Sequence, residues 1–265
     1  MTKLNNVLFK YMPLRSSFFE NFLLRATRRE DLNDPFELQP STHAWAHYYS
    51  QVGNTRIRSI DEMIEIIEKT DFLKEQEEQF PMFNNTGIMS FSKSEDNILM
   101  WSHYADCHKG MKLGFDASHE FFCNSKPYDS YTGRLHQIEY TTNRPNNIVD
   151  NPQELFTTKA IDWKYENEYR LILDISCSDV SYKGGVSDDN IYEFDCFNYL
   201  FEENLFFMFR IPKEAVISVT FGSKSDKNEI SKITSKIRGD KDLKHVEINQ
   251  VSLSKSNYST RIVKL

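Results

Sequence analysis

The chain has 265 residues and a formal net charge of -7, and 39% of its residues are hydrophobic and 14% aromatic. With 9 glycines and 8 prolines, this composition excludes collagen-like, low-complexity and wholly disordered chains. The acidic balance also argues against a protein that holds nucleic acid through a broad basic field, because phosphate binding needs clustered Lys and Arg.

Hydrophobic periodicity and turn-forming residues predict both strands and helices along the chain. In chain order we expect a strand at Val7–Met12, a helix at Ser16–Leu24, an extended piece at Leu24–Thr27, a helix at Ser59–Phe80 that opens on the capping-box pair Ser59 and Glu62, a strand at Gly87–Ser92, a helix at Asn97–Ala105, strands at Gly110–Asp116 and Arg134–Thr141, a helix at Pro152–Ile161, strands at Glu166–Ile175, Leu205–Ile211 and Val216–Phe221, a helix at Lys227–Arg238, and extended segments at Lys244–Leu253 and Tyr258–Leu265.

These elements do not alternate as a regular βαβα series, so we predict an α+β fold with a mixed or antiparallel sheet and flanking helices. One domain is expected over residues 1–265, with loop insertions near residues 41–58, 124–133 and 178–190. Asn33-Asp34-Pro35 has turn chemistry, and we expect Phe36 to anchor that turn in the core.

The lack of a long apolar run and of a signal-peptide pattern predicts a cytoplasmic protein with no membrane partner. No apolar run reaches 18 residues, and the first residues lack a signal-peptide pattern. The cysteines are widely spaced and are expected to be reduced, mostly buried thiols. They are Cys107, Cys123, Cys177 and Cys196.

The stretch that ends in Trp163-Lys-Tyr-Glu166-Asn-Glu168-Tyr-Arg170 is the most informative for chemistry. Because side chains alternate along a strand, Glu166, Glu168 and Arg170 are predicted to share one face. Repulsion between two such carboxylates would raise the pKa of one while the guanidinium fixes the other. A solvent-exposed, salt-linked face is the alternative.

Two further segments carry polar side chains at the ends of predicted elements. Ser90 and Ser92 lie on one side of a strand, where they suit either a polar ligand or a turn. The helix Met100–Ala105 carries Trp101, His103 and Tyr104, with His103 as either a ligand-binding group or a hydrogen-bonded core residue.

No metal site is predicted from the histidines. His103 and His108 would point about 140° apart on a helix, and His43 and His47 have no third ligand nearby. The chain also lacks the GxxxxGK[ST], GxGxxG, GxSxG and HExxH patterns, so P-loop, Rossmann, α/β-hydrolase and common zinc-protease functions lose their main support.

Several blocks of the sequence together resemble a bacterial family catalogued as domain of unknown function 2971. They occur in order from about residue 6 to the C-terminus, and the second and fourth are the most specific. The blocks are Phe9-Lys10-Tyr11, Asn33-Asp34-Pro35-Phe36-Glu37, Ser90-Phe91-Ser92, Met100-Trp101-Ser102-His103-Tyr104-Ala105 with His108 and Gly110, Trp163-x-x-Glu166-x-Glu168-x-Arg170, and Phe221-Gly222.

The order of elements is also similar to that of ADP-ribosyltransferases, which use a basic residue or His on the first strand, a polar residue on a middle strand and a glutamate on a late strand. The matching positions are Lys10 with Tyr11, Ser90 with Ser92, and Glu168 with Glu166. The chain departs from the pattern at Lys10, where Arg or His is usual.

This second resemblance implies NAD as a substrate. Glu168 would stabilise the positive charge that develops on the ribose, and Glu166 would orient or deprotonate the acceptor. The other implied roles are ribose or carboxamide binding by Ser90 and Ser92, stacking on nicotinamide by Tyr11, Trp101 or Tyr104, ligand binding by His103, and pyrophosphate binding by Lys10 or Arg170.

Two other classes of function remain open from the residues. A non-catalytic module that binds a ligand or partner, in a stress or phage-defence setting, would use the aromatic residues to line a cleft. A metal-dependent nuclease would hold Mg²⁺ with carboxylates, although the acidic balance disfavours it. A small-molecule nucleotide fits the NAD hypothesis, and the residues do not define whether a protein or a nucleic acid is the acceptor.

Overall fold

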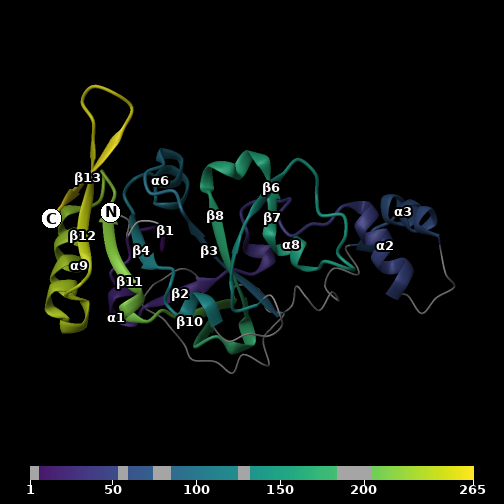
Figure 1. Ribbon diagram of the computed structural model, residues 1–265, viewed down its shortest axis with the longest axis horizontal. Coiled ribbons are helices and arrows are strands. Elements are labelled where there is room, and N and C mark those ends of the chain that lie inside the picture. Colours follow the sequence, from purple (N-terminus) through teal and green to yellow (C-terminus); the bar gives the residue numbers. More distant parts are fainter. Residues whose placement is uncertain (1–5, 53–58, 74–84, 125–131, 184–204) are drawn as a thin grey trace.

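The structure is a computed structural model and describes residues 6–52, 59–73, 85–124, 132–183 and 205–265 (Figure 1). Its largest element is a mixed sheet of eight strands in the order β13-β12-β11-β4-β1-β3-β8-β5. In that order the strands are Thr260–Lys264, Glu247–Leu253, Val216–Phe221, Met111–Asp116, Val7–Met12, Thr86–Ser92, Glu168–Asp174 and Leu135–Gln137. The predicted α+β class with a mixed sheet is therefore confirmed.

One parallel pair makes the sheet mixed. Strands β11 and β12 run parallel and are connected by helix α9 (Lys227–Gly239), whereas the other strand pairs of this sheet are antiparallel within the described residues. Asp226 caps α9 through its side chain, and Ile230, Ile233 and Ile237 are buried at helical spacing. This helix therefore covers the sheet at its β11–β13 end (Figure 1).

The remaining strands form two small sheets. Strand β10 (Leu205–Arg210) lies between β2 (Leu23–Ala26) and β9 (Val180–Lys183). Strands β6 (Glu139–Thr141) and β7 (Thr158–Ala160) form a parallel pair.

The other helices are short and lie around the sheets. They are α1 (Phe18–Asn21), α2 (Thr42–Val52), α3 (Ile60–Lys69), α6 (Ile98–Tyr104), α7 (Phe121–Asn124) and α8 (Gln153–Thr157), with 3-10 turns η2 (Arg29–Asp31), η3 (Ile161–Glu166), η4 (Ile175–Cys177), η6 (Lys213–Ala215) and η7 (Lys241–Leu243). Helices α2 and α3 lie at the opposite end of the molecule from α9 (Figure 1). Within the described ranges, no helix is long and apolar enough to cross a membrane.

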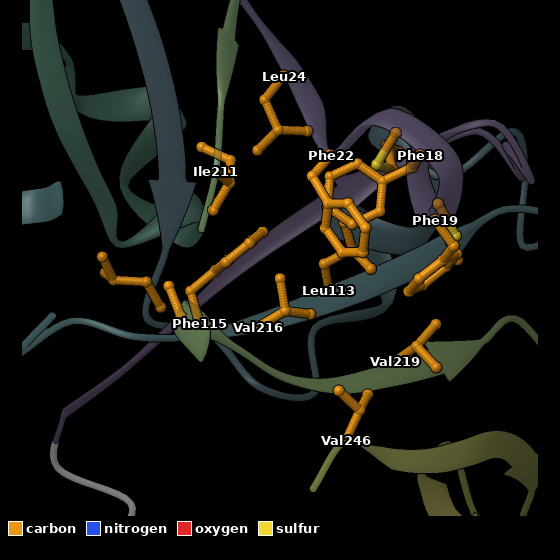
Figure 2. Packing of buried hydrophobic residues seen from close by; sticks show 14 of the residues in the cluster. Phe18, Phe19, Phe22, Leu24, Leu113, Phe115, Ile211, Val216, Val219 and Val246 are labelled. Atoms are coloured by element: carbon orange, nitrogen blue, oxygen red, sulfur yellow. The ribbon is translucent and has the colours of Figure 1, made fainter. Parts of the chain in front are cut away.

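The largest core cluster joins the phenylalanines of α1 to the strands on one side of the sheet (Figure 2). Alternation along β4 places Leu113 and Phe115 on this side, where both are fully buried. Phe18, Phe19 and Phe22 pack over them, with tilted and edge-on ring contacts among the three. This packing fixes β1 and β4 within the sheet whose strands β1, β3 and β8 carry the site.

Several boundaries differ from the sequence expectation. The expected loop at residues 41–58 contains helix α2, because Ser41 caps it through the Ala44 amide and Ala44 and Trp45 become buried. The capping box of Ser59 and Glu62 is confirmed, but α3 ends at Lys69 rather than residue 80. Residues 53–58 and 74–80 lie outside the described part of the chain.

Other elements are divided where one was expected. The predicted strand at residues 134–141 is two strands, β5 and β6, that join different sheets, and the predicted helix at residues 152–161 ends at Thr157 and continues as β7. The expected loop at residues 178–190 includes β9, and its residues 184–190 lie outside the described ranges, as do residues 125–131 of the insertion expected at 124–133.

The expected burial of Phe36 is wrong. Its ring is 57% exposed, with the Arg144 guanidinium 4.9 Å from the ring centroid. The turn is fixed instead by Asp34, whose Oδ1 accepts the Phe36 amide at 2.9 Å, and by buried Glu37 and Leu38. The pattern of apolar residues did not reveal which side of this turn faces inward.

Replacing Phe36 with Ala should therefore change the free energy of unfolding by less than about 0.5 kcal/mol, because an exposed ring contributes little apolar burial. Chemical denaturation of wild type and variant measures the difference. A loss of about 3 kcal/mol or more would mean that the ring is packed in the core.

The cysteines are less buried than expected. Cys107 and Cys123 are exposed and Cys177 is partly buried, and none of these three described cysteines is in a disulfide. Cys107 lies in a tight turn directed to solvent, and Cys123 lies on the outer side of the short α7. Cys196 falls outside the described residues.

Two glycines join the turn after α6 to the end of β11. A Cβ on Gly110 would lie 2.2 Å from the Met12 carbonyl oxygen, and one on Gly222 would lie 2.1 Å from the His108 carbonyl oxygen. The preceding residues Asp106–His108 all have positive φ, between 45° and 73°. This close backbone contact gives a structural reason for glycine at both positions.

A buried lysine on β4 offers a test of the packing around β1. Lys112 is 1% exposed, its ammonium lies 4.4 Å from the centroid of the Phe9 ring, and it donates to the Glu95 carbonyl. Burial lowers its pKa from the usual 10.5 to about 8, although Glu95 and Asp96 act to raise it. The native state therefore releases this proton at a lower pH than the unfolded chain does.

Replacing Lys112 with Met should stabilise the protein at pH 7 by on the order of 2 kcal/mol, since it removes a charge that is costly to bury. Between about pH 8 and 10.5 the wild type gains stability from this residue as the native lysine loses its proton. The advantage of the variant should therefore shrink towards pH 10. Denaturation curves at pH 7 and pH 10 measure it, and an equal difference at both values would contradict the burial effect.

Candidate functional site

A cavity of about 360 Å³ lies where β1, β3 and β8 meet α6 and the η2 turn. Its volume falls in the range of small-ligand pockets. It is lined by Phe9, Lys10, Tyr11, Thr27, Asp31, Leu32, Asn33, Glu37, Ser90, Phe91, Ser92, Met100, His103, Tyr104, Lys159, Glu166 and Glu168. Segments far apart in the sequence therefore border one space.

Strand register explains why the polar residues of β3 and β8 face the same way. Ser92 pairs with Glu168, and Ser90 pairs with Arg170, in antiparallel strands whose paired side chains share a face. Strand β1 joins β3 at Phe9 and Ser92, which is the single residue pair between these two strands in the described ranges. The sheet is thus weakly joined beside the cavity.

Lys10 approaches the cavity differently from the serines. Because Phe9 pairs with Ser92, Lys10 belongs to the opposite face, and its ammonium lies 5.6 Å from the centroid of the Phe91 ring. The ammonium donates to the Ser90 carbonyl oxygen at 2.9 Å. Burial lowers the pKa of Lys10 to about 8, although the Glu168 carboxylate acts to raise it.

Five buried charges form the floor of the site. The Lys159 ammonium lies 2.7 Å from Glu166, 3.2 Å from Glu168 and 3.7 Å from Glu37. Arg170 binds Glu168 through Nε at 2.8 Å, forms an ion pair with Glu37, and donates to the main chain of α8. Three carboxylates thus face two cations, with one negative charge in excess.

Burial and neighbouring charge compete at this floor. Burial raises the pKa of the Glu168 carboxyl, Lys159 acts against this, and the nearby Glu166 carboxylate adds to it. At Lys159, burial acts to lower the pKa, but Glu168 and Glu166 together outweigh it and hold that pKa above its usual value. The ammonium therefore stays charged and keeps both carboxylates in place.

Glu166 is reached from the cavity side by hydroxyl groups. The Tyr104 hydroxyl donates to Glu166 Oε1 and in turn accepts from Asn33 Nδ2 at 3.2 Å. Ser92 Oγ donates to the Glu166 carbonyl oxygen. Burial and the Glu166 charge raise the pKa of Tyr104, so this phenol stays protonated and donates.

Glu166 and Glu168 come together in a different way from the alternation along one strand that the sequence predicts. Strand β8 begins at Glu168, whereas Glu166 ends the η3 turn and Asn167 between them has a φ of 45°. Glu166 therefore does not alternate along the strand as expected, and Lys159 draws the two carboxylates together instead. Both glutamates are 3% exposed, which excludes the alternative of a solvated face.

Most of the predicted site residues border the cavity, but two do not. Trp101 is 1% exposed and meets Tyr11 edge-on at 5.1 Å, and Arg170 is fully buried behind Glu168. Arg170 therefore supports Glu168 from below and has no surface for a pyrophosphate. The Tyr11 hydroxyl donates to main-chain carbonyls at residues 94 and 95.

His103 lies at the rim of the cavity and is exposed. Its Nδ1 lies 2.8 Å from the Tyr165 hydroxyl, and the two rings meet edge-on at 5.8 Å. His108 lies apart from it and contacts the Ser102 hydroxyl at 3.0 Å. In the described ranges, no group of three His, Cys, Asp or Glu side chains is placed to hold a metal ion.

Sequence reasoning missed two members of the floor, Glu37 and Lys159. Both belong to segments that drew attention, the Asn33–Glu37 turn and the stretch before Trp163, but for other reasons. Neither residue carries a local signal of this role, since Lys159 already has an acidic neighbour at Asp162. Pairing between distant segments, which only the fold reveals, brings them to Glu166 and Glu168.

Residues 100–171 match the family model described as protein of unknown function (DUF2971). This match supports the resemblance to a family of unknown function, and it includes Lys159, Glu166, Glu168 and Arg170. The Asn33–Glu37 turn and strand β3 lie outside the matched residues. No curated protein and no solved structure matches the chain.

Proposed function

We propose that this protein cleaves the bond between nicotinamide and ribose in NAD and transfers the ADP-ribosyl group to an acceptor or to water. The observation that carries this proposal is the alignment of Ser92 with Glu168 on neighbouring strands beside one cavity, where Glu166 is held next to Glu168. This arrangement supplies a fixed carboxylate and hydroxyls at one end of the space.

The charge of the cavity suits that chemistry. On its floor the carboxylates of Glu37, Glu166 and Glu168 face the cations of Lys159 and Arg170, while Asp31 in its lining is paired with Arg25. This excess of negative charge favours the pyridinium cation of bound NAD. It stabilises the oxocarbenium ion more strongly, because that ion forms when the glycosidic bond breaks and a carboxylate then lies close to the ribose. The aromatic rings of Tyr11 and Tyr104 offer apolar surface for nicotinamide.

The proposed reaction breaks one bond and forms one bond at ribose C1′. The bond from ribose C1′ to the nicotinamide nitrogen breaks, and its electron pair leaves with nicotinamide, which becomes neutral. Glu168 stabilises the positive charge on the ribose, and a lone pair of the acceptor or of water forms the new bond to C1′. The Glu166 carboxylate takes the proton that this nucleophile releases.

The test is turnover of NAD labelled in its nicotinamide and its adenine moieties, with and without protein and nucleic-acid acceptors. Release of free nicotinamide by the wild-type chain is expected, and the fate of the adenine label separates hydrolysis from transfer. If wild type releases no nicotinamide with acceptors present, the proposal is wrong and the cavity is better explained as the ligand site of a non-catalytic module.

A further inference from the structure

A second cavity of about 270 Å³ shares Glu37 and Lys159 with the first. It is formed by the turn at residues 34–38, the segment from Thr141 to Pro145 and the residues around β7. The proposed NAD chemistry assigns no role to it. What it would bind is indicated by three features of its lining.

The first feature is an exposed aromatic ring at its edge. Phe36 borders the cavity and is 57% exposed, and the Arg144 guanidinium lies 4.9 Å from its centroid. Faces of aromatic rings attract cations, and guanidinium groups stack on them because they are planar and weakly hydrated. The Phe36 ring thus already contacts one guanidinium group, that of Arg144.

The second feature is a buried carboxylate with a vacant acceptor. Asp34 borders the cavity and is 5% exposed, and its Oδ1 accepts the Phe36 amide. Its Oδ2 is buried and has no hydrogen-bond partner among the described residues. An unpaired buried acceptor is costly, so a donor entering from the cavity would be bound favourably.

The third feature is the charge of the residues that line the cavity. The lining carries the carboxylates of Asp34, Glu37 and Asp162, and the cations of Arg144 and Lys159. Glu37 and Lys159 already pair with each other and with the floor of the first site, whose Arg170 guanidinium also interacts electrostatically with Asp34. Over that floor and this cavity together, the carboxylates of Asp34, Glu37, Asp162, Glu166 and Glu168 outnumber the cations of Arg144, Lys159 and Arg170. A cationic ligand is therefore favoured over an anion or a neutral molecule.

We propose that the second cavity binds a guanidinium group, stacked against Phe36 and donating to Asp34 Oδ2. The group belongs either to a small molecule or to an arginine side chain of a peptide, and both offer the same planar cation with several N–H donors. Binding at this cavity does not depend on the proposed NAD chemistry, because no atom of NAD takes part in it.

The experiment is calorimetric titration of the full chain, without NAD, with agmatine, with cadaverine and with a blocked Gly-Arg-Gly peptide. Agmatine and cadaverine are both dications, but only agmatine carries a guanidinium. We expect agmatine, the peptide or both to bind, and at least one to bind roughly tenfold tighter than cadaverine, in line with a gain of about one charge-assisted hydrogen bond. Which of the two binds identifies the source.

Three variants locate the binding. Asp34→Asn keeps an oxygen for the Phe36 amide but removes the charge, and it should weaken binding roughly ten- to a hundredfold. Phe36→Ala should weaken it about two- to fivefold. Tyr258→Ala removes another exposed ring far along the chain, on the turn between β12 and β13, and should have no effect.

Circular dichroism confirms that each variant is folded. The proposal is overturned if neither guanidinium probe binds at millimolar concentration, if cadaverine binds as tightly as they do, or if Asp34→Asn and Phe36→Ala both bind as wild type does. Because these are binding measurements, loss of the NAD proposal leaves them unchanged, and their failure leaves NAD turnover untouched.

Discussion

Replacing Glu168 with Gln should reduce nicotinamide release from NAD by on the order of 10²–10³. The carboxylate is held at the cavity by Lys159 at 3.2 Å and by Arg170 at 2.8 Å. Gln keeps the size and one acceptor oxygen, but it lacks the negative charge that would face the developing oxocarbenium ion. Labelled-NAD turnover by wild type and variant measures the effect.

Glu37→Gln is the matched control for this variant. Glu37 is as buried as Glu168 and binds the same Arg170 and Lys159, so its replacement disturbs the same ion network. A loss of packing or charge balance alone would affect both variants equally. We expect a much smaller loss of turnover in Glu37→Gln, and equal loss in both folded variants would assign the effect to the network rather than to Glu168.

Glu166→Gln separates the two outcomes of the reaction. It should reduce transfer to an acceptor more than hydrolysis, because water needs less orientation than a bound nucleophile. The ratio of transferred to hydrolysed ADP-ribose, measured with the adenine label, should fall in this variant. An unchanged ratio would remove Glu166 from activation of the acceptor.

Replacing Lys159 with Met should destabilise the protein by about 3–5 kcal/mol, since it leaves Glu37, Glu166 and Glu168 with Arg170 as their remaining buried cation. Met fills a similar volume, so little of the loss comes from packing. Urea denaturation at pH 7 measures it.

Acid should reverse part of this loss. In the variant, no ammonium opposes the effect of burial and of like-charged neighbours on the buried carboxyl groups. The pKa of one of them is therefore raised, and it gains a proton at a higher pH than in the unfolded chain. Lys69→Met, which breaks an exposed pair with Glu65, is the control and should change stability by less than about 1 kcal/mol. If Lys159→Met behaves like Lys69→Met, the buried network is not a determinant of stability.

The extended segments were the best predicted part of the fold. Strand β1 has the predicted bounds, because its residues alternate between a core of phenylalanines and the cavity side. Helix α2 was missed because its buried residues are the consecutive Ala44, Trp45 and Ala46 among polar and aromatic neighbours, without a clear apolar stripe. Its burial depends on contacts with α3, which are not visible locally.

The candidate site was predictable only in part, for a similar reason. Residue types and alternation indicated Ser90, Ser92 and Glu168, since their orientation is set by their own strands. The positions of Glu37 and Lys159 depend on a turn and on a short strand of another sheet, whose distance from β8 has no local signal. Charged residues that meet from three segments are therefore recognised as one network only in the folded chain.

The single residue pair between β1 and β3 has a consequence for amide hydrogen exchange. Strand β1 is joined to β4 by six residue pairs and β3 to β8 by seven, whereas in the described ranges one pair links the two halves. Both halves contribute to the same core cluster and stay packed, but the amides of β1 and β3 that face each other should exchange faster than those within each ladder. A molecule bound in the cavity would touch both halves, and slower exchange along this seam would then report its occupancy.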